Sequence, residues 1–398
     1  MEPMLRFKAD DGSDFPDWEE KTLGEICEQL KASIDPRNNP TKQFIEYSMP
    51  AYDNHMAAQA VLGQSMNSAR KILSAPCVLI NKLNVRKRRI WVVEHPEDNA
   101  VCSSEFVPLT SAESDLRFLG YLAMTDSFTS YLLDCSSGSS NSQKRVTPDT
   151  ILQYLVSLPS LPEQRKIADL LSAVDDVISA QEAEVAAWEK RKKGVMQKLF
   201  SQEVRFKADD GSDFPDWEEQ KIEDVCVLNP RTEQLDDEFY YMDLGSIDHG
   251  RWEAPEIVNK VDAPSRAQRV AAIDDVFFQS VRPYNMGHYH YVAAKDKQVV
   301  ASTGYIQARM RNGSNDFLYQ LFYEERFNAE VNARCTGSNY PAINSRKFGE
   351  ITVALPSLPE QRKIADCLSA LDDVVIKAKN ELAKWQELKK GLLQQMFV

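Results

Sequence analysis

The chain has 398 residues, enough for two or three domains with cores of their own, and 43% of them are hydrophobic, as in an ordinary globular protein. It has no run of about 18 apolar residues and no apolar segment near the N-terminus, which argues against a membrane span and a secretory signal. The seven cysteines form no C-x-x-C pair, which favours a reduced, cytoplasmic protein with free thiols. The net charge of −13 argues at first sight against nucleic acid as a partner, but it does not exclude a local basic surface.

The first feature along the chain is an acidic segment that occurs twice. Residues 6–20 read RFKADDGSDFPDWEE, and residues 205–219 repeat them letter for letter. A second block, LPSLPEQRKIAD, occupies residues 158–169 and recurs at residues 355–366. The segments between these blocks do not resemble each other. Two copies of one frame around two different inserts predict two different modules held in one fixed relation.

The first insert mixes short helical and strand patterns. Pro76–Ile80 and Arg89–Val93 are predicted strands around the basic loop NKLNVRKR, and the polar stretch 136–142 is a predicted flexible loop. Basic side chains on such loops can bind phosphates or base edges, although they can equally be solvated surface. The candidates for DNA contact in this insert are Lys82, Arg86, Lys87, Arg88, Lys144 and Arg145.

Each repeated LPSLPEQR block opens a predicted helix of about 40 residues, which is about 60 Å long at about 1.5 Å per residue. Ser160 with Glu163, and Ser357 with Glu360, match the S-x-x-E capping box. Apolar residues then recur with heptad spacing, which predicts a coiled-coil seam. The predicted seam positions are Ile167, Leu171, Val174, Ile178 and Trp188 in the first helix, and Ile364, Leu368, Leu371, Val375 and Trp385 in the second.

The two helices are expected to pair with each other. Antiparallel pairing is favoured because parallel pairing would need a connection along the whole helix; packing of each helix only on its own insert is the alternative. Both seams carry a lysine, Lys192 and Lys389, a residue that costs stability and fixes register. The N-terminal segment is expected to continue the second copy beyond Phe397, so that the chain ends meet.

The second insert has the same outline in different letters. Residues 276–281 are a predicted strand, followed by the turn RPYNMGHYHYV, a predicted helix over Leu318–Val331 and the polar loop RCTGSNYPAINSRKF. Two histidines without a carboxylate or thiolate at ligand spacing make a poor metal site, so no metal is predicted. The candidates for DNA contact here are Arg282, Tyr284, Asn285, His288, Tyr289, Ser338, Asn339 and Tyr340.

The sequence has no phosphate-binding G-x-x-x-x-G-K-[ST] loop, no dinucleotide fingerprint, no H-E-x-x-H motif and no nucleophile elbow. The patterns predict a non-catalytic scaffold of class α/β (α+β). It has two globular recognition domains, joined by a pair of long antiparallel coiled-coil helices in an internal pseudo-two-fold repeat. The expected divisions are residues 1–157, 158–204, 205–354 and 355–398.

The chain resembles the specificity (S) subunit of type I restriction-modification systems over essentially its whole length. The resemblance rests on LPSLPEQRKIADLLSAVDDVI and its second copy, on helices ending KKGVMQKLF and KKGLLQQMF, and on DFPDWEEKTLGEI. YMDLGSIDHGRW, DVFFQSVRPYN and TGSNYPAINSRKF also resemble that family's target-recognition halves. One departure is KRVTPDTIL, which stands in the first insert where the second has the sequence YPAI.

The resemblance implies a DNA-reading subunit whose two target-recognition domains each read one half of a split, asymmetric site in double-stranded DNA. The helices would act as a ruler and dock methyltransferase (M) subunits, and a restriction/translocase (R) subunit would join them. S-adenosylmethionine would be bound by M, with no cofactor in this chain. Two alternatives remain open: a tandem ligand-binding adaptor with a coiled-coil docking region and no nucleic acid, and an enzyme with an unrecognised site in one insert.

Overall fold

The computed structural model describes residues 3–138, 140, 142–231, 234–248, 250–252 and 254–397. Ser139 and Asn141 of the predicted flexible loop lie outside the described residues. The chain divides into two compact units: unit 1 comprises Met1–Glu182 with Asn380–Val398, and unit 2 comprises Ala183–Lys379. Within the described ranges, no helix is long and apolar enough to cross a membrane. All seven cysteines are free thiols.

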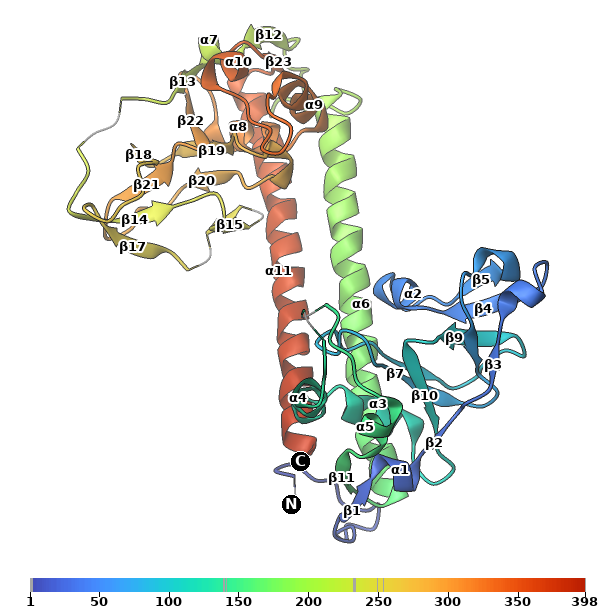
Figure 1. Ribbon diagram of the computed structural model, residues 1–398. Helices are drawn as coiled ribbons and strands as arrows, with labels where there is room; N and C mark the ends of the chain where they lie inside the picture. Colours follow the sequence, from blue (N-terminus) through green and yellow to red (C-terminus); the bar gives the residue numbers. More distant parts are fainter. Residues whose placement is uncertain are drawn as a thin grey trace. The chain divides into compact units, whose positions relative to one another are not determined.

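Unit 1 contains two main sheets and a short ribbon (Figure 1). One sheet has the order β2 (Glu28–Gln29), β10 (Phe106–Thr110), β7 (Cys77–Asn81), β8 (Ile90–Val93). The other has the order β3 (Ser33–Ile34), β6 (Arg70–Ile72), β9 (Ala100–Ser103), β4 (Gln43–Tyr47), β5 (Gln59–Leu62). The ribbon pairs β1 (Glu19–Thr22) with β11 (Leu155–Leu158). The helices are α1 (Leu23–Ile26), α2 (Met49–Asp53), α3 (Leu116–Ala123), α4 (Asp126–Asp134) and α5 (Pro148–Leu152), with short 3-10 turns η1 (Pro36–Asn38) and η2 (Gly63–Ser65).

Unit 2 repeats this plan. Its first sheet has the order β13 (Cys226–Leu228), β22 (Tyr305–Met310), β19 (Asp275–Gln279), β20 (Tyr289–Tyr291). Its second has the order β17 (Glu256–Asn259), β14 (Glu238–Met242), β21 (Val299–Ser302), β18 (Ala267–Val270). Two ribbons pair β12 (Glu218–Lys221) with β23 (Thr352–Leu355), and β15 (Ile247–Asp248) with β16 (Arg251–Trp252). The helices are α7 (Ile222–Val225), α8 (Asn315–Leu321), α9 (Glu325–Arg334) and α10 (Ser345–Gly349), with the 3-10 turn η3 (Pro283–Asn285).

The two inserts therefore share the order of the first sheet and of four strands in the second, although their sequences differ; unit 1 adds the edge strand β3 and unit 2 adds the ribbon β15–β16. In each second sheet the central pair is parallel, β4 with β9 in unit 1 and β14 with β21 in unit 2, while the neighbouring pairs are antiparallel. The predicted strands near residues 76–80, 89–93 and 276–281 are confirmed as β7, β8 and β19. Two different sequences thus build the same scaffold.

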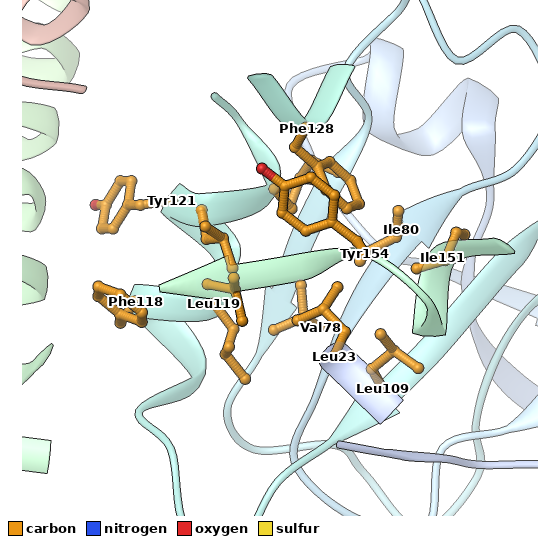
Figure 2. Packing of buried hydrophobic residues seen from close by; sticks show 14 of the residues in the cluster. Leu23, Val78, Ile80, Leu109, Phe118, Leu119, Tyr121, Phe128, Ile151 and Tyr154 are labelled. Atoms are coloured by element: carbon orange, nitrogen blue, oxygen red, sulfur yellow. The ribbon is translucent and has the colours of Figure 1, made fainter. Parts of the chain in front are cut away.

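The core of unit 1 lies between its first sheet and the short helices. Figure 2 shows Val78 and Ile80 of β7 facing Leu119 of α3, with Phe128 and Tyr154 stacked edge to face at 4.9 Å between ring centroids. Strand residues that alternate across a sheet place every second apolar side chain on the covered face. This core fixes where β7 ends and the following loop begins.

The helix predicted over Leu318–Val331 is wrong as a single element. The structure has α8 and α9 instead, separated at residues 322–324. Glu324 caps α9, because its carboxylate accepts a hydrogen bond from the backbone N–H of Phe327 at 2.6 Å. Periodicity of apolar residues does not reveal a cap inside such a run, since Phe322, at the break itself, is fully buried.

The repeated acidic segment is tied to the start of each long helix through one buried carboxylate. Arg6 donates to both oxygens of Glu163 at 3.0 Å, and Trp18 Nε1 donates to Oε2 at 3.1 Å. The same bonds link Arg205 and Trp217 to Glu360 in unit 2. The predicted capping boxes are therefore wrong: these glutamates hold the repeated segment, and the hydroxyls of Ser160 and Ser357 find no hydrogen-bond partner among the residues that the structure describes.

The long helices α6 (Leu161–Phe200) and α11 (Leu358–Met396) each run through both units, and within unit 2 the end of α6 packs on the start of α11. Lys192 of α6 forms an ion pair with Asp372 of α11 at 2.5 Å, and its ammonium lies 5.5 Å from the ring centroid of Tyr323. Asp372 also accepts from Gln320 at 2.9 Å. The seam lysine therefore joins both helices to the globular part of unit 2.

Unit 1 has the same arrangement with the helices exchanged. Lys389 of α11 pairs with Asp175 of α6 at 2.6 Å and lies 5.5 Å from the ring centroid of Tyr121, whose hydroxyl donates to Asp175 at 2.8 Å. In each unit the start of one helix meets the end of the other, so antiparallel pairing is confirmed. The predicted seam is buried at Ile167, Leu171, Val174, Ile364, Leu368 and Val375, and half-buried at Ile178, Trp188, Leu371 and Trp385.

The two ends of the chain meet in unit 1 (Figure 1). The backbone N–H of Leu5 donates to the carbonyl of Gln395 at 3.0 Å, and the ring of Phe397 stacks on Phe118 at 5.2 Å between centroids. In unit 2 the chain passes continuously through this place, where Phe200 contacts Phe317. The expected circular order of the two copies is therefore confirmed.

Candidate nucleic-acid interface

Two loops of unit 1 that are distant in sequence lie side by side. The loop after β7 meets the segment before α5, because Asn84 N–H donates to the carbonyl of Lys144 at 2.8 Å and Val146 N–H donates to that of Lys82 at 3.0 Å. Arg145 pairs as an isolated bridge with Leu83. The basic residues of both predicted loops are thus gathered in one cluster, which we call loop cluster 1 (residues 82–89, 136–138, 140 and 142–147).

Unit 2 has the same arrangement in loop cluster 2 (residues 280–288 and 335–344). Arg282 N–H donates to the carbonyl of Pro341 at 2.7 Å, and Ile343 N–H donates to that of Ser280 at 3.0 Å. These bonds place Lys144 and Pro341 at equivalent positions. The segment KRVTPDTIL, which sequence could not align with YPAI, is therefore its structural counterpart.

A buried amide holds each cluster at the end of its central strand. Asn81 at the end of β7 donates to the carbonyl of Leu83 at 2.9 Å and accepts from the N–H of Arg89 at 3.0 Å. Gln279 at the end of β19 donates to the carbonyl of Val281 at 2.9 Å and accepts from the N–H of Gly287 at 2.9 Å. Both loops are pinned at two points, so their tips are presented by a firm scaffold.

Equivalent residues of the two loops have left-handed backbone conformations. The φ angle is +53° at Asn84 and +51° at Arg282. Non-glycine residues rarely adopt this region, asparagine being the mildest exception, and such strain gathers at functional sites. Each side chain also has a covered polar atom, Oδ1 of Asn84 and Nε of Arg282, for which the described part of the chain supplies no hydrogen-bond partner. The sequence prediction missed Asn84, and the only local signal was asparagine's tolerance of this conformation between two strands.

The predicted cationic side chains of loop cluster 1 differ in their freedom. Arg86 and Lys87 are exposed, and no ion pair is found for either within the described ranges; Lys82 and Lys144 are half-buried. Arg88 forms an ion pair with Asp126, which lowers the pKa of that carboxyl. Arg145 pairs with Glu105 at 2.9 Å. Among the predicted cations of loop cluster 1, Arg86 and Lys87 are therefore the most accessible to a phosphate group.

Loop cluster 2 presents aromatic and amide groups. The Arg282 guanidinium lies 4.2 Å from the ring centroid of Tyr340, which is 65% exposed. Tyr284 and Asn285 are exposed on η3, as are Ser338 and Asn339 beside Tyr340. A hollow of about 540 Å³ adjoins the cluster; its lining residues are Arg266, Val281, Thr303, Gly304, Tyr340 and Ala342. Arg266, an exposed cation, was not singled out from the sequence.

His288 does not belong to this surface. Its ring is fully buried, stacked on Phe278 at 4.3 Å between centroids, and Nδ1 accepts the backbone N–H of Gln279 at 3.1 Å. Burial lowers the pKa of His288 to about 3, so the ring is neutral. We therefore withdraw it as a DNA contact. Tyr289 is half-buried in β20, and burial raises its pKa.

In the part of the chain that the structure describes, no group of three or more His, Cys, Asp or Glu side chains is arranged to hold a metal ion. Burial raises the pKa of Cys27, Cys77 and Cys226 to about 12, which keeps these thiols protonated and unreactive. Polar groups converge at the surface in the two loop clusters, and they suit binding through hydrogen bonds and charge.

A family described as "Type I restriction modification DNA specificity domain" matches residues 16–187 and again residues 215–385. The type I restriction enzyme MjaVIII specificity subunit of Methanocaldococcus jannaschii is 25% identical over 254 residues, which are 60% of each chain. The HindI specificity subunit of Haemophilus influenzae is 22% identical over 165 residues, 41% of this chain and 36% of that one. The chain thus spans about 60% or less of the length of these relatives.

Solved structures share the fold. The S subunit of a type I restriction-modification system from M. genitalium has a TM-score of 0.61 at 16% identity, covering 100% of this chain and 99% of that one. A chain from a structure described as "Structural basis underlying complex assembly and conformational transition of the type I R-M system" has a TM-score of 0.57 at 21% identity, covering 96% and 97%. At these identities the likeness concerns the fold.

Proposed function

Because the chain belongs to the type I restriction-modification DNA specificity family, we propose that it is the non-catalytic subunit that selects the DNA sequence for a type I restriction-modification complex. The observation that carries this proposal is the pair of loop clusters. One backbone scaffold, with the same strand order and the same two-point anchoring, presents different side chains in the two units. A constant scaffold with variable tips suits a subunit that reads two different half-sites, and the target is therefore an asymmetric, bipartite sequence.

The contacts divide by chemistry. Arg86 and Lys87 bind phosphate, because they are exposed cations without an ion pair in the described ranges. Arg282, Tyr284 and Asn285 reach bases, since guanidinium, phenol and amide groups carry directional donors or acceptors. Because the whole chain has a negative net charge, it binds DNA weakly by itself. Cationic side chains of the partner subunits supply the remaining contacts to DNA.

The long helices dock the methyltransferase subunits and set the distance between the half-sites. Helix α6 has 40 residues and spans about 60 Å, on the order of one to two turns of DNA at about 34 Å per turn. In unit 1 a partly apolar groove of about 910 Å³ runs beside both helices, lined among others by Met56, Met124, Ile178 and Leu393, and offers a docking surface. S-adenosylmethionine belongs to the methyltransferase subunit, a restriction/translocase subunit completes the complex, and the assembly works in the cytoplasm on chromosomal DNA.

The test is to express the chain with methyltransferase and restriction subunits of a type I system, and to map modified bases by single-molecule sequencing. We expect one asymmetric motif with a fixed spacer, lost when the gene for this chain is deleted. The purified complex should bind duplexes of that motif, with affinity falling steeply as salt rises.

Replacing both Arg86 and Lys87 by glutamine should weaken binding and reduce the salt slope by about one per cation removed, without changing the motif. Lys8→Gln, in the N-terminal segment rather than the loops, serves as the matched control and should leave the slope unchanged. A complex that assembles but binds no duplex would refute the proposal and favour the adaptor alternative.

A further inference from the structure

We propose that Asn84 and Arg282 are the paired base-reading residues of the two units, Asn84 reading an adenine in one half-site and Arg282 a guanine in the other. This inference rests on the proposed function and sharpens it. It assigns a base to one residue in each loop cluster, and it adds a residue that the sequence did not bring forward.

The two residues occupy one position in the shared scaffold. Each lies three residues after the buried amide, Asn81 or Gln279, that holds its loop. Each donates its backbone N–H across to the second loop of its cluster, to the carbonyl of Lys144 or Pro341. Their φ angles agree within 2°. Two loops of unrelated sequence therefore adopt the same backbone conformation at this position.

The left-handed backbone conformation is energetically unfavourable for an arginine, so its presence at position 282 calls for an explanation. Side chains with a Cβ clash with the following carbonyl in the left-handed region, and glycine or asparagine would relieve the strain at position 282. An arginine at such a position indicates that its guanidinium group serves binding. The anchored backbone also fixes the direction in which each side chain leaves the loop, as recognition of a base edge demands.

Both side chains carry unused hydrogen-bonding capacity. Oδ1 of Asn84 and Nε of Arg282 are covered from solvent, and no partner for either is found among the described residues. The neighbouring Arg88, Arg89 and Arg145 are all paired with carboxylates. Buried polar atoms are nearly always satisfied, so an unpaired one at the same place in both units calls for a ligand. A turn of either side chain out of its loop would expose this atom, and a base edge in a DNA groove would then supply its partner.

The side-chain chemistry selects the base. An asparagine amide accepts from adenine N6–H₂ and donates to N7, while an arginine guanidinium donates twice to guanine O6 and N7. The guanidinium carbon of Arg282 lies over the ring of Tyr340, 4.2 Å from the ring centroid, so the fork lies beside an aromatic side chain that is itself exposed. Each such pair discriminates against a wrong base by roughly tenfold to a hundredfold.

The experiment exchanges the two residues in the full chain, expressed with its methyltransferase and restriction subunits, and maps methylation in the cell. With Arg282→Asn, one guanine of the second half-site should become adenine; with Asn84→Arg, one adenine of the first half-site should become guanine. Asn84→Asp is a milder second variant that keeps the backbone conformation. It should shift the same position toward cytosine, because a carboxylate only accepts hydrogen bonds. Lys8→Gln, an exposed position outside both loop clusters, is the control and should leave both half-sites and their methylation unchanged.

Unchanged half-sites in a folded Asn84→Asp complex and a folded Arg282→Asn complex would overturn the inference. So would loss of binding to every sequence by both folded variants, which would make these residues non-specific contacts. In either case the wild-type complex still shows its bipartite motif, so the proposed function stands. Absence of any motif with the wild-type chain is the separate result that would remove the proposed function.

Discussion

The buried carboxylate that ties the repeated segment to each long helix leads to a quantitative prediction. Glu163 is fully buried and receives two hydrogen bonds from Arg6 and one from Trp18, at 3.0 to 3.1 Å. Glu163→Ala removes the carboxylate to which Arg6 and Trp18 donate. Breaking a buried pair by deleting one partner costs about 3–5 kcal/mol, because it leaves a charge uncompensated.

The structure places the expected cost near the lower end of that range. The Arg6 side chain is 19% exposed, and its Nη2 keeps the carbonyls of Phe15 and Pro16 as acceptors at 3.3 and 2.7 Å. We therefore expect Glu163→Ala to lower the free energy of opening of unit 1 by about 3 kcal/mol. Glu163→Gln, which keeps the shape and an acceptor, should cost about half as much.

Hydrogen exchange measured by mass spectrometry is the suitable assay, because a chain with two units need not unfold in one step. Amides of β7 and β10 report on unit 1, and those of β19 and β22 report on unit 2. Glu360→Ala should produce the same loss in unit 2. Lys8→Ala is the control: it breaks an exposed pair with Asp14, at 66% and 83% exposure, and should cost less than about 1 kcal/mol. A loss in unit 1 no larger than that of the control would refute the reasoning.

Three further predictions concern the helices and the buried histidine. Lys192→Met should destabilise unit 2 by about 1–3 kcal/mol, because it leaves half-buried Asp372 without its cation. The double variant Lys192→Met with Asp372→Leu should recover that stability. Hydrogen exchange measures both effects, and a double variant that recovers nothing would contradict the prediction. A four-residue insertion after Gln181 should change the preferred spacer between half-sites or abolish binding, and an unchanged spacer in the methylation map would disprove the ruler. The pKa of His288 is about 3 in the folded protein and about 6.5 in the unfolded chain. Its contribution to the free energy of unfolding is therefore complete above pH 6.5. That contribution is lost as the pH falls from 6.5 toward 3, by up to about 1.4 kcal/mol per pH unit. Urea unfolding should show a flatter acid slope in His288→Gln, and an identical slope in both proteins would contradict it.

The pairing of the long helices and the repeated frame around the two inserts could be predicted from the sequence, because they depend on repeated blocks and on heptad spacing. Heptad spacing marks a helix seam whatever surrounds it, and the matching lysines in both seams anticipated the ion pairs of Lys192 and Lys389. The antiparallel pairing and the meeting of the chain ends followed from the order of the repeated blocks. These features depend on spacing along the chain, which a single sequence contains.

The role of the repeated letters needed the tertiary structure. Glu163 looked like a capping residue because its neighbours in sequence fit that motif, yet its partner Arg6 lies 157 residues earlier. Likewise, Glu324 ends one helix pattern and begins another through a contact that leaves no period. The bond of Glu163 joins distant segments and the cap of Glu324 is local, but neither changes the spacing of apolar residues, so the pattern could not reveal them.

The sequence by itself determined that two unlike inserts sit in one repeated frame, and that their loops are rich in cations, amides and aromatic rings. Only the tertiary structure decided that the inserts share the order of their main strands, that Lys144 stands where Pro341 does, and that His288 is in the core while Asn84 matches Arg282. The physical reason is that strand pairing satisfies backbone groups, which all residues share, so very different letters can build the same sheets. What differs at the loop tips then lies at equivalent places, and that equivalence exists only in three dimensions.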